Sequence, residues 1–584
     1  MSASSPSSPV APATFAELFT PKLITVFREG YGLKDLRTDA IAGLTVAIVA
    51  LPLSMAIAIA SGTTPDRGLY TAIVGGFLVS LFGGSRFQIG GPAGAFIVLV
   101  AATIHTHGLD GFLLAAMMSG VILLALGLLR LGSYIKFLPY PVTVGFTAGI
   151  AVIIFASQLK DFFGLTLAGP EPGEFLAKME TLGAAAATVN PAAVGVALAS
   201  ILVIVALKRS IPSFPGMLIA VALAALATWV FDLPIETIGS RFGGIPRTLP
   251  APSLPPLSWD KAMAVLPDAF SFALLGSIES LLSAVVADGM TGRRHRSNCE
   301  LAAQGIANIV SPLFGGLCVT GTIARTATNV RTGARGPVSG MLHAVFLFLF
   351  MLLAAPLASA IPLAALAAVL VMVAWNMAEK HEFVLLLRSS KGDAVVLLAT
   401  FLLTVFRDLT TGIVVGFAIG AVLFIHRMAQ TTGIEAHVPP LLEDGSDAAG
   451  GRPRYSPAQA TDPEMVIYRI SGAFFFGAAS SVGSILDRIG DRYRTLVIDF
   501  SAVPFLDSTA ANAIGVIARR VESHGAKMVV TGAAPAVRRS LLTHGLRPPH
   551  VTYAASVEQA VADHRSDAQA PSTPSPETIG QGGA

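Results

Sequence analysis

The sequence predicts a polytopic, all-α membrane protein that is followed by a small α/β domain. Of its 584 residues, 53% are hydrophobic and only 13% are charged, whereas soluble domains usually carry about 25% charged residues. Several long stretches contain no Asp, Glu, Lys or Arg, for example residues 40–65, 111–129 and 336–378. A bilayer core of about 30 Å needs roughly 20 apolar helical residues, so we expect these stretches to span a membrane.

The hydrophobic pattern predicts 14 transmembrane segments. This even number places both ends of the chain in the cytoplasm, on the side where the Lys and Arg residues concentrate. The predicted segments are 39–60, 68–83, 92–106, 111–131, 140–158, 191–208, 215–231, 267–289, 299–316, 322–334, 337–358, 361–377, 393–406 and 410–428.

Composition divides the chain into five parts. A Ser/Pro/Ala-rich start without the features of a signal peptide predicts a disordered cytosolic segment, and a shift to Gly, Pro and charge after the last span predicts a linker. Short apolar runs alternating with helical periodicity then predict an α/β domain, before a low-complexity tail. The expected boundaries are 1–36, 37–429 for the transmembrane domain, 430–461 for the linker, 462–565 for the α/β domain and 566–584.

Within the α/β domain, four short β-branched runs predict strands, and three segments between them have helical periodicity. The predicted strands are 464–470, 495–501, 527–532 and 550–555. With only two cysteines, Cys299 and Cys318, the chain has too few for a disulfide framework or a zinc site. No motif indicates an enzyme, a cofactor, a metal site or nucleic-acid binding.

Two glycine-rich segments interrupt the hydrophobic sequence in a similar way. The tetrapeptide LFGG occurs at 81–84 and 313–316, and it precedes SRFQIGGPAGAF in the first case and LCVTGTIARTATNV in the second. Each segment has a short extended run, then glycine, then a piece too short to cross the bilayer. Interrupted segments at corresponding places in two halves indicate the binding site of a transporter.

The first N–H groups of a helix that begins inside the membrane lack partners, and its dipole places about half a positive charge there. Two such N-termini that face each other would bind an anion. The candidate binding residues at these starts are small or polar: Ala93, Gly94 and Ala95, and Thr322 and Ala324. Alternatively, the glycines only permit close helix packing.

Two charges fall inside predicted spans. Glu279 has apolar sequence on both sides except for serines and a glycine, and an intramembrane carboxylate is functional by default. It would bind a proton or Na⁺, or it is a structural glutamate capped by serines. Arg325, in the first turn of the second interrupted segment, would strengthen an anion site, or it pairs with Glu279 and serves the architecture.

Together these motifs resemble the sulfate permease (SulP) family of anion transporters, in its bacterial branch. The resemblance rests on VALPLSMAIAIASG (49–62), GGSRFQIGGPAGAF (83–96), GSIESLLSAVVADGM (276–290), ANIVSPLFGG (307–316) and TGTIARTATNVRTGAR (320–335). It implies two inverted repeats of seven spans, in core and gate domains like those of uracil transporters. It also implies an elevator movement and a cytosolic STAS domain (sulfate transporter and anti-sigma antagonist).

The resemblance also implies roles for single residues. Phe96 would line the anion site from the third helix, Ala324 and Arg325 from the tenth, and Leu53 would cover it from the first. Glu279 matches the acid of the eighth helix that is linked to cation coupling, where a glutamate favours H⁺. Many plant and animal relatives have Gln at the position of Leu53. With Leu at this position, the chain resembles bacterial bicarbonate or dicarboxylate carriers.

In the soluble domain, VPFLDSTAANAIG (503–515) resembles the STAS signature. There Ser508 is a candidate helix N-cap and a candidate regulatory phosphorylation site.

The sequence therefore predicts an H⁺-coupled symporter of sulfate, bicarbonate or C4-dicarboxylate in a bacterial inner membrane. A homodimer is implied, and a cytosolic partner of the STAS domain is a further candidate. The alternatives are Na⁺-coupled bicarbonate transport, anion exchange, or an anion sensor that signals through the STAS domain. A nucleobase carrier is disfavoured, because the tenth segment has Arg325 and no acid.

Overall fold

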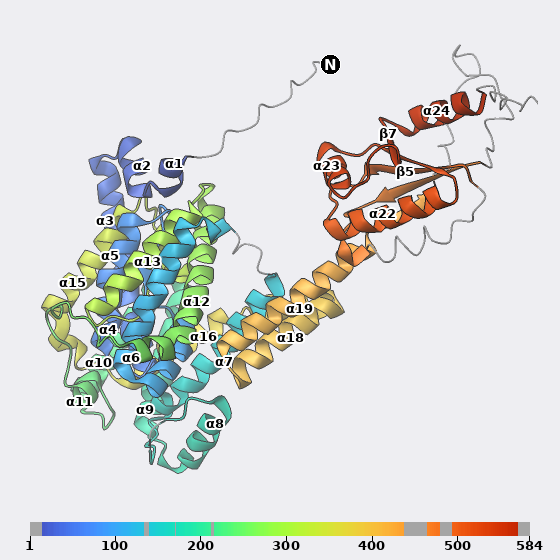
Figure 1. Ribbon diagram of the computed structural model, residues 1–584. Helices are drawn as coiled ribbons and strands as arrows, with labels where there is room; N and C mark the ends of the chain where they lie inside the picture. The colour runs from blue at the N-terminus through green and yellow to red at the C-terminus, as the bar shows by residue number, and fades with distance from the viewer. Residues whose placement is uncertain are drawn as a thin grey trace, which may run out of the picture. The chain divides into compact units, whose positions relative to one another are not determined.

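A computed structural model of the protein describes residues 14–133, 139–169, 171–211, 215–436, 464–478 and 493–569. The chain divides into two compact units, Met1–Gly420 and Ala421–Ala584, and each has its own hydrophobic core. The first unit is a helical bundle and the second contains a sheet with helices (Figure 1).

Regular structure begins earlier than the composition suggests. In place of a disordered segment that reaches residue 36, the chain forms α1 (Phe15–Phe19) and α2 (Lys22–Arg28) before the first span. The side chain of Thr14 accepts a hydrogen bond from Glu17 in a capping box that starts α1. Composition does not predict these helices, because the Ser/Pro-rich residues before them dominate the composition of the N-terminal segment.

The first unit consists of helices joined by short connections. Their bounds are α3 (Leu33–Ala60), α4 (Pro65–Tyr70), η1 (Thr71–Gly75), α5 (Gly76–Phe82), η2 (Gly94–Phe96), α6 (Ile97–Leu128), η3 (Leu131–Ser133), α7 (Tyr140–Phe163), α8 (Phe175–Ala184), η5 (Ala186–Thr188), α9 (Pro191–Ser210), α10 (Gly216–Val230), α11 (Ile238–Phe242), α12 (Trp259–Thr291), α13 (Ser297–Leu313), α14 (Ile323–Arg331), α15 (Val338–Ala358), α16 (Leu363–Met377), α17 (Lys380–Ser389), α18 (Lys391–Phe406) and α19 (Leu409–Gln430), which continues into the second unit.

Each of the 14 predicted transmembrane segments overlaps one or more of these helices. Among the described residues, eight helices are long and apolar enough to cross a membrane by length and composition. The predicted segments 92–106 and 111–131 are joined within α6 at Gly108, whose φ of 70° and ψ of 178° break the helix. Because such a φ is strained for other residues, the glycine lets the chain turn here without a separate loop.

The helices of the first unit pack in two groups. In one group, α6 packs against α12 and α13, and α3 packs against α15. In the other, α7 packs against α16 and α18, and α9 packs against α10 and α16. These groups agree with the core and gate domains that the sequence motifs imply.

Small residues set the distance between helices α6 and α13. A Cβ on Gly305 would lie 2.6 Å from the backbone nitrogen of Leu124, and a Cβ on Gly120 would lie 2.7 Å from the carbonyl oxygen of Gly305. Backbones approach this closely only where neither residue carries a side chain.

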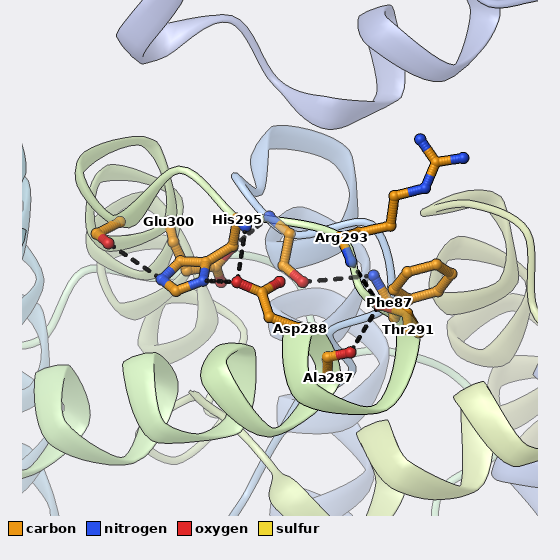
Figure 2. A network of polar contacts seen from close by, with 9 residues as sticks. Phe87, Ala287, Asp288, Thr291, Arg293, His295 and Glu300 are labelled. Carbon is orange, nitrogen blue, oxygen red and sulfur yellow. Dashed lines mark hydrogen bonds and ion pairs between the residues drawn. The ribbon is translucent and has the colours of Figure 1, made fainter. Parts of the chain in front are cut away.

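The loop between α12 and α13 is held by a polar network (Figure 2). The carboxylate of Asp288 accepts a hydrogen bond from the backbone nitrogen of His295 at 3.0 Å, and it lies 2.7 Å from Nδ1 of the same histidine. The other ring nitrogen of His295 lies 3.0 Å from the hydroxyl of Ser297. The end of α12 is thereby fixed to the start of α13.

The second unit contains a five-stranded sheet in the order β3-β4-β5-β6-β7. Strands β4 to β7 run parallel to one another, and β3 is antiparallel to β4. The strands are β3 (Gly433–Ala436), β4 (Met465–Ser471), β5 (Thr495–Ala502), β6 (Lys527–Thr531) and β7 (Val551–Ala554), and the helices are α22 (Ser508–Ser523), α23 (Pro535–Thr543) and α24 (Val557–Gln569).

The four predicted strands coincide with β4 to β7, and two of the three predicted helices with α22 and α23. The third, at residues 480–489, lies outside the described residues. Strand β3 occupies the start of the segment predicted as a linker, because Gly433–Ala436 pairs with Tyr468–Ser471 and so completes the sheet edge. Its four residues are too short to give a periodic signal in the sequence.

Asp499 is a buried carboxylate in the central strand β5. It accepts hydrogen bonds from Nε of Arg469 at 2.8 Å and from the backbone and hydroxyl of Ser501 at 2.9 and 2.8 Å. Burial raises the pKa of this carboxyl, but the hydrogen bonds from Arg469 and Ser501 outweigh that effect and hold the pKa below its usual range. Asp499 therefore stabilises the folded domain in its charged form.

We expect Gly305→Ala to lower the thermal unfolding temperature of the detergent-solubilised protein, because overpacking at a tight contact costs about 1–3 kcal/mol. Gly195→Ala, on α9, is the matched control, since a Cβ there meets nothing within 4 Å. Equal unfolding temperatures for the two variants would contradict the role of Gly305.

We expect Asp499→Asn to destabilise the C-terminal domain at neutral pH and to have little effect in acid. Since the folded pKa lies below the usual value, the stability that Asp499 contributes is present above that value and is lost as the pH falls through the folded pKa. Limited proteolysis of the full-length protein across a pH series measures this difference. If Asp499→Asn increased sensitivity to proteolysis by the same amount at every pH, Asp499 would not stabilise the domain through its charged form.

Candidate functional site

The two interrupted segments meet in a short antiparallel ladder inside the first unit. Strand β1 (Gly90–Gly91) pairs with β2 (Thr320–Gly321), with Gly90 opposite Gly321 and Gly91 opposite Thr320. The backbone nitrogen of Thr322 also donates to the carbonyl of Ile89 at 3.0 Å. Two chain segments that are more than 200 residues apart in the sequence therefore cross each other.

Two of the glycines lie against polar side chains at the crossing. A Cβ on Gly321 would lie 1.8 Å from Nε2 of Gln88, and a Cβ on Gly91 would lie 2.2 Å from Nη1 of Arg325. A Cβ at either position would require Gln88 or Arg325 to move. The two glycines thus leave room for these polar side chains beside the crossing.

A helix begins on each side directly after the crossing. The 3-10 turn η2, which leads into α6, has Ala93 as its N-cap, and α14 has Thr322 as its N-cap. Neither N-cap side chain accepts a hydrogen bond from its helix, so the first N–H groups keep their capacity to bind a ligand. Two helix N-termini next to one crossing form an electropositive site.

The predicted binding residues differ in exposure. Leu53, Ala93, Ala95, Phe96 and Thr322 are buried. Of the remaining two small residues at the helix starts, Gly94 is partly exposed and Ala324 is exposed. The atoms that are accessible at the two helix starts thus belong to the backbone and to small side chains.

Helices of both groups surround the first helix start. The ring of Phe96 stacks on Phe272 of α12 with centroids 6.0 Å apart. On the other side, a Cβ at Gly94 would lie 3.4 Å from Cδ1 of Ile154 in α7 and 3.7 Å from Sδ of Met377 in α16. The start of α6 therefore lies between α12 and the helices α7 and α16.

Arg325 is buried, with 1% of its surface exposed. Its Nη2 donates to Oγ of Ser54 at 3.2 Å and to the carbonyl of Pro92 at 3.3 Å. Its Nε and Nη1 have no partner among the described residues, and none of the ion pairs found there includes Arg325. The alternative in which Arg325 pairs with Glu279 is therefore absent from this conformation.

Glu279 lies on α12 and is 8% exposed. The serines that follow it bind other groups: Ser280 lies 2.8 Å from the hydroxyl of Thr320, and Ser283 donates to Thr326 at 3.1 Å. Within the described part of the chain, no hydrogen bond or ion pair is found for the carboxylate of Glu279. The interpretation of Glu279 as a glutamate capped by serines does not match this arrangement.

Sequence reasoning missed the side chains that satisfy the backbone of the extended runs. The amide of Asn308 donates to the carbonyl of Val319 at 2.7 Å and accepts from its nitrogen at 2.9 Å. Asn329 donates to the carbonyl of Phe87 at 2.9 Å. For Asn308, an asparagine in an apolar run was the available signal, because burial of an amide requires partners.

The hydroxyl of Thr326 completes this set. It accepts from the nitrogen of Ile89 at 3.1 Å and from the hydroxyl of Ser283. One side chain of α14 thus joins the first extended run to α12. It can be recognised only once the fold has brought the three segments together.

In the second unit, the predicted N-cap is displaced by one residue. Asp507 is the N-cap of α22, and its carboxylate accepts from the backbone nitrogens of Ala510 at 2.8 Å and Phe476 at 3.0 Å. Aspartate and serine cap equally well, so the pair of residues left the choice open. Ser508 is the first helical residue and is exposed.

No group of three His, Cys, Asp or Glu side chains that could hold a metal ion occurs among the described residues.

Comparison with known proteins covers most of the chain. A profile of the sulfate permease family matches residues 36–400, and a profile of the STAS domain matches residues 456–560. A Bacillus subtilis protein named putative sulfate transporter YvdB is 41% identical over 523 residues, which is 89% of this chain and 95% of the relative. The bicarbonate transporter BicA of a Picosynechococcus strain is 30% identical over 528 residues, which is 87% of this chain and 90% of the relative.

Solved structures agree with these matches. The transmembrane domain of a cyanobacterial bicarbonate transporter BicA superposes with a TM-score of 0.60 at 33% identity and covers 66% of this chain and 98% of that chain. The murine Solute Carrier 26 family member A9 anion transporter, in the inward-facing state, gives a TM-score of 0.82 at 19% identity and covers 96% of both chains. The latter is a likeness of fold alone.

These relatives are named transporters and not enzymes, as the sequence motifs predict. The match of the family profile, the identity to the two bacterial relatives and the crossed helix starts agree. The chain belongs to the sulfate permease family, as a multi-pass membrane protein with a C-terminal STAS domain.

Proposed function

We propose that the protein is a secondary active transporter that binds a small anion between the N-termini of η2–α6 and α14. The observation that carries this proposal is the buried guanidinium of Arg325, whose Nε and Nη1 have no partner among the described residues. A buried charge without a counter-charge is strongly unfavourable. An anion bound nearby supplies that charge and accepts hydrogen bonds from the open helix starts.

The substrate class is a small inorganic or organic anion, namely sulfate, bicarbonate or a C4-dicarboxylate. Relatives named sulfate transporter and bicarbonate transporter support the first two. Backbone N–H groups bind any of these oxyanions, and the covering side chain Leu53 adds no hydrogen-bond donor. Competition by a panel of unlabelled anions against uptake into proteoliposomes selects among the three.

Coupling to H⁺ is assigned to Glu279. Its carboxylate is buried on α12, and no described residue neutralises it. A carboxyl in such a place binds and releases a proton as access to water changes. Uptake that responds to a Na⁺ gradient and not to a pH gradient would instead favour Na⁺ coupling at the same residue.

The proposal includes an elevator movement of the core group against the gate group, and the apolar contact between the groups at the site supports it. Gly94 faces the apolar side chains of Ile154 and Met377, and an apolar contact without directional bonds permits sliding. The proposal includes a homodimer in the bacterial inner membrane with both termini in the cytoplasm. The exposed hydroxyl of Ser508 is available to a regulatory partner or kinase.

We expect Arg325→Ala to raise the KM for anion uptake about 10- to 100-fold, since a hydrogen bond to a charged group contributes about 1.5–3 kcal/mol. Arg331→Ala, at the other end of α14, is the matched control. The measurement is the initial rate of labelled anion uptake into proteoliposomes. Saturable binding without accumulation by the wild-type protein would contradict transport and favour a sensor.

We expect Glu279→Gln to abolish uptake driven by a pH gradient while anion exchange at equal pH persists, because glutamine cannot carry a proton. Glu382→Gln, on α17, is the control and should keep pH-driven uptake. If Glu279→Gln still accumulates anion in response to a pH gradient, Glu279 does not couple transport to H⁺.

A further inference from the structure

The N-terminal helices α1 and α2 have an apolar side that the described residues of the first unit leave exposed. Phe27 is 55% exposed and Ile24 is 42% exposed. They are three residues apart on α2 and therefore share a face. Phe15 on α1 and Leu33 at the start of α3 are also exposed. By contrast, Val26 is buried.

The segment is nevertheless fixed to the helical bundle. The backbone nitrogen of Lys22 donates to the carbonyl of Gly83 at 2.9 Å. Nη1 of Arg296 donates to the carbonyl of Thr20 at 2.6 Å and to the hydroxyl of Thr25 at 3.1 Å. Arg296 follows His295, which is held by Asp288. The N-terminal segment is therefore fixed to the end of α5 and to the start of α13.

This face continues a membrane-facing surface. Leu36, Ile41 and Leu44 of α3 are exposed apolar residues of a transmembrane helix. Figure 1 shows α1 and α2 at the end of the bundle where α3 begins. Helix α2 therefore lies next to the end of α3 at which these exposed apolar residues begin.

Basic residues accompany the apolar ones. Arg28, Lys34 and Arg37 are exposed, and none of the ion pairs found in the described residues includes them. An apolar face bordered by Lys and Arg is typical of helices that lie in the membrane interface. Anionic lipid headgroups attract such basic residues at the membrane surface.

We propose that α1, α2 and the first turn of α3 form a binding surface for anionic phospholipid. Ile24, Phe27 and Leu33 insert into the acyl region of the adjacent leaflet, while Arg28 and Lys34 contact headgroup phosphates. The surface moves with α5 and α13, to which it is bonded. It does not depend on which anion is transported.

The test uses the full-length protein in proteoliposomes, with its three tryptophans replaced by Phe and a single tryptophan introduced by Phe27→Trp. We expect brominated phospholipid to quench this tryptophan and aqueous iodide to leave it largely unaffected. Phe505→Trp, at an equally exposed position of the C-terminal unit, is the control. Iodide quenching at position 27 without quenching by brominated lipid would overturn the proposal.

A second arm tests the headgroup. In the Phe27→Trp background, brominated phosphatidylglycerol should quench more strongly than brominated phosphatidylcholine. Arg28→Gln combined with Lys34→Gln should reduce this preference by about fivefold for each charge removed. Arg539→Gln, in the C-terminal unit, should leave it unchanged. Equal quenching by both lipids in the unsubstituted background, or a quench that varies only with protein density as expected for contact with a second copy, would overturn it.

Discussion

The structure depends on satisfying the backbone of two segments that run through the bilayer interior without being helical. Irregular backbone is tolerated there only where protein or a cavity provides hydrogen bonds. The β1–β2 ladder meets part of this need, and Asn308, Thr326 and Asn329 meet more of it. These three side chains belong to α13 and α14, so the crossing and the packing of helices around it form one unit.

The polar groups left open follow from the same arrangement. Two nitrogens of Arg325 are among the buried polar atoms without a partner in the described residues, and the first N–H groups of the two helices receive no side-chain cap. Glu279 has no cationic partner among the described residues. The interruption of the backbone thus leaves two uncapped helix starts beside a partly unpaired guanidinium.

Much of this could be predicted from the sequence. Charge-free runs located the spans, and the Gly-rich interruptions located the crossing, because periodicity and helix breakers are local signals. Contacts between distant residues gave no such signal: Asn329 bonds Phe87 across 242 positions, and the separation of Arg325 from Glu279 depends on the rotation of whole helices. The predicted N-cap of α22 was displaced for a local reason: Asp507 and Ser508 are both good N-cap residues, so the sequence does not decide between them.

Three of the four residues in the ladder are glycines, so Thr320 alone has a side chain that can distinguish one alignment from the next. A slip by one residue would displace the two helix starts relative to each other by about 3.3 Å, which is comparable to a hydrogen-bond length. The alignment is held from outside, by amides and hydroxyls on neighbouring helices. The spacing of the two helix starts is thus set in part by residues that lie outside the ladder.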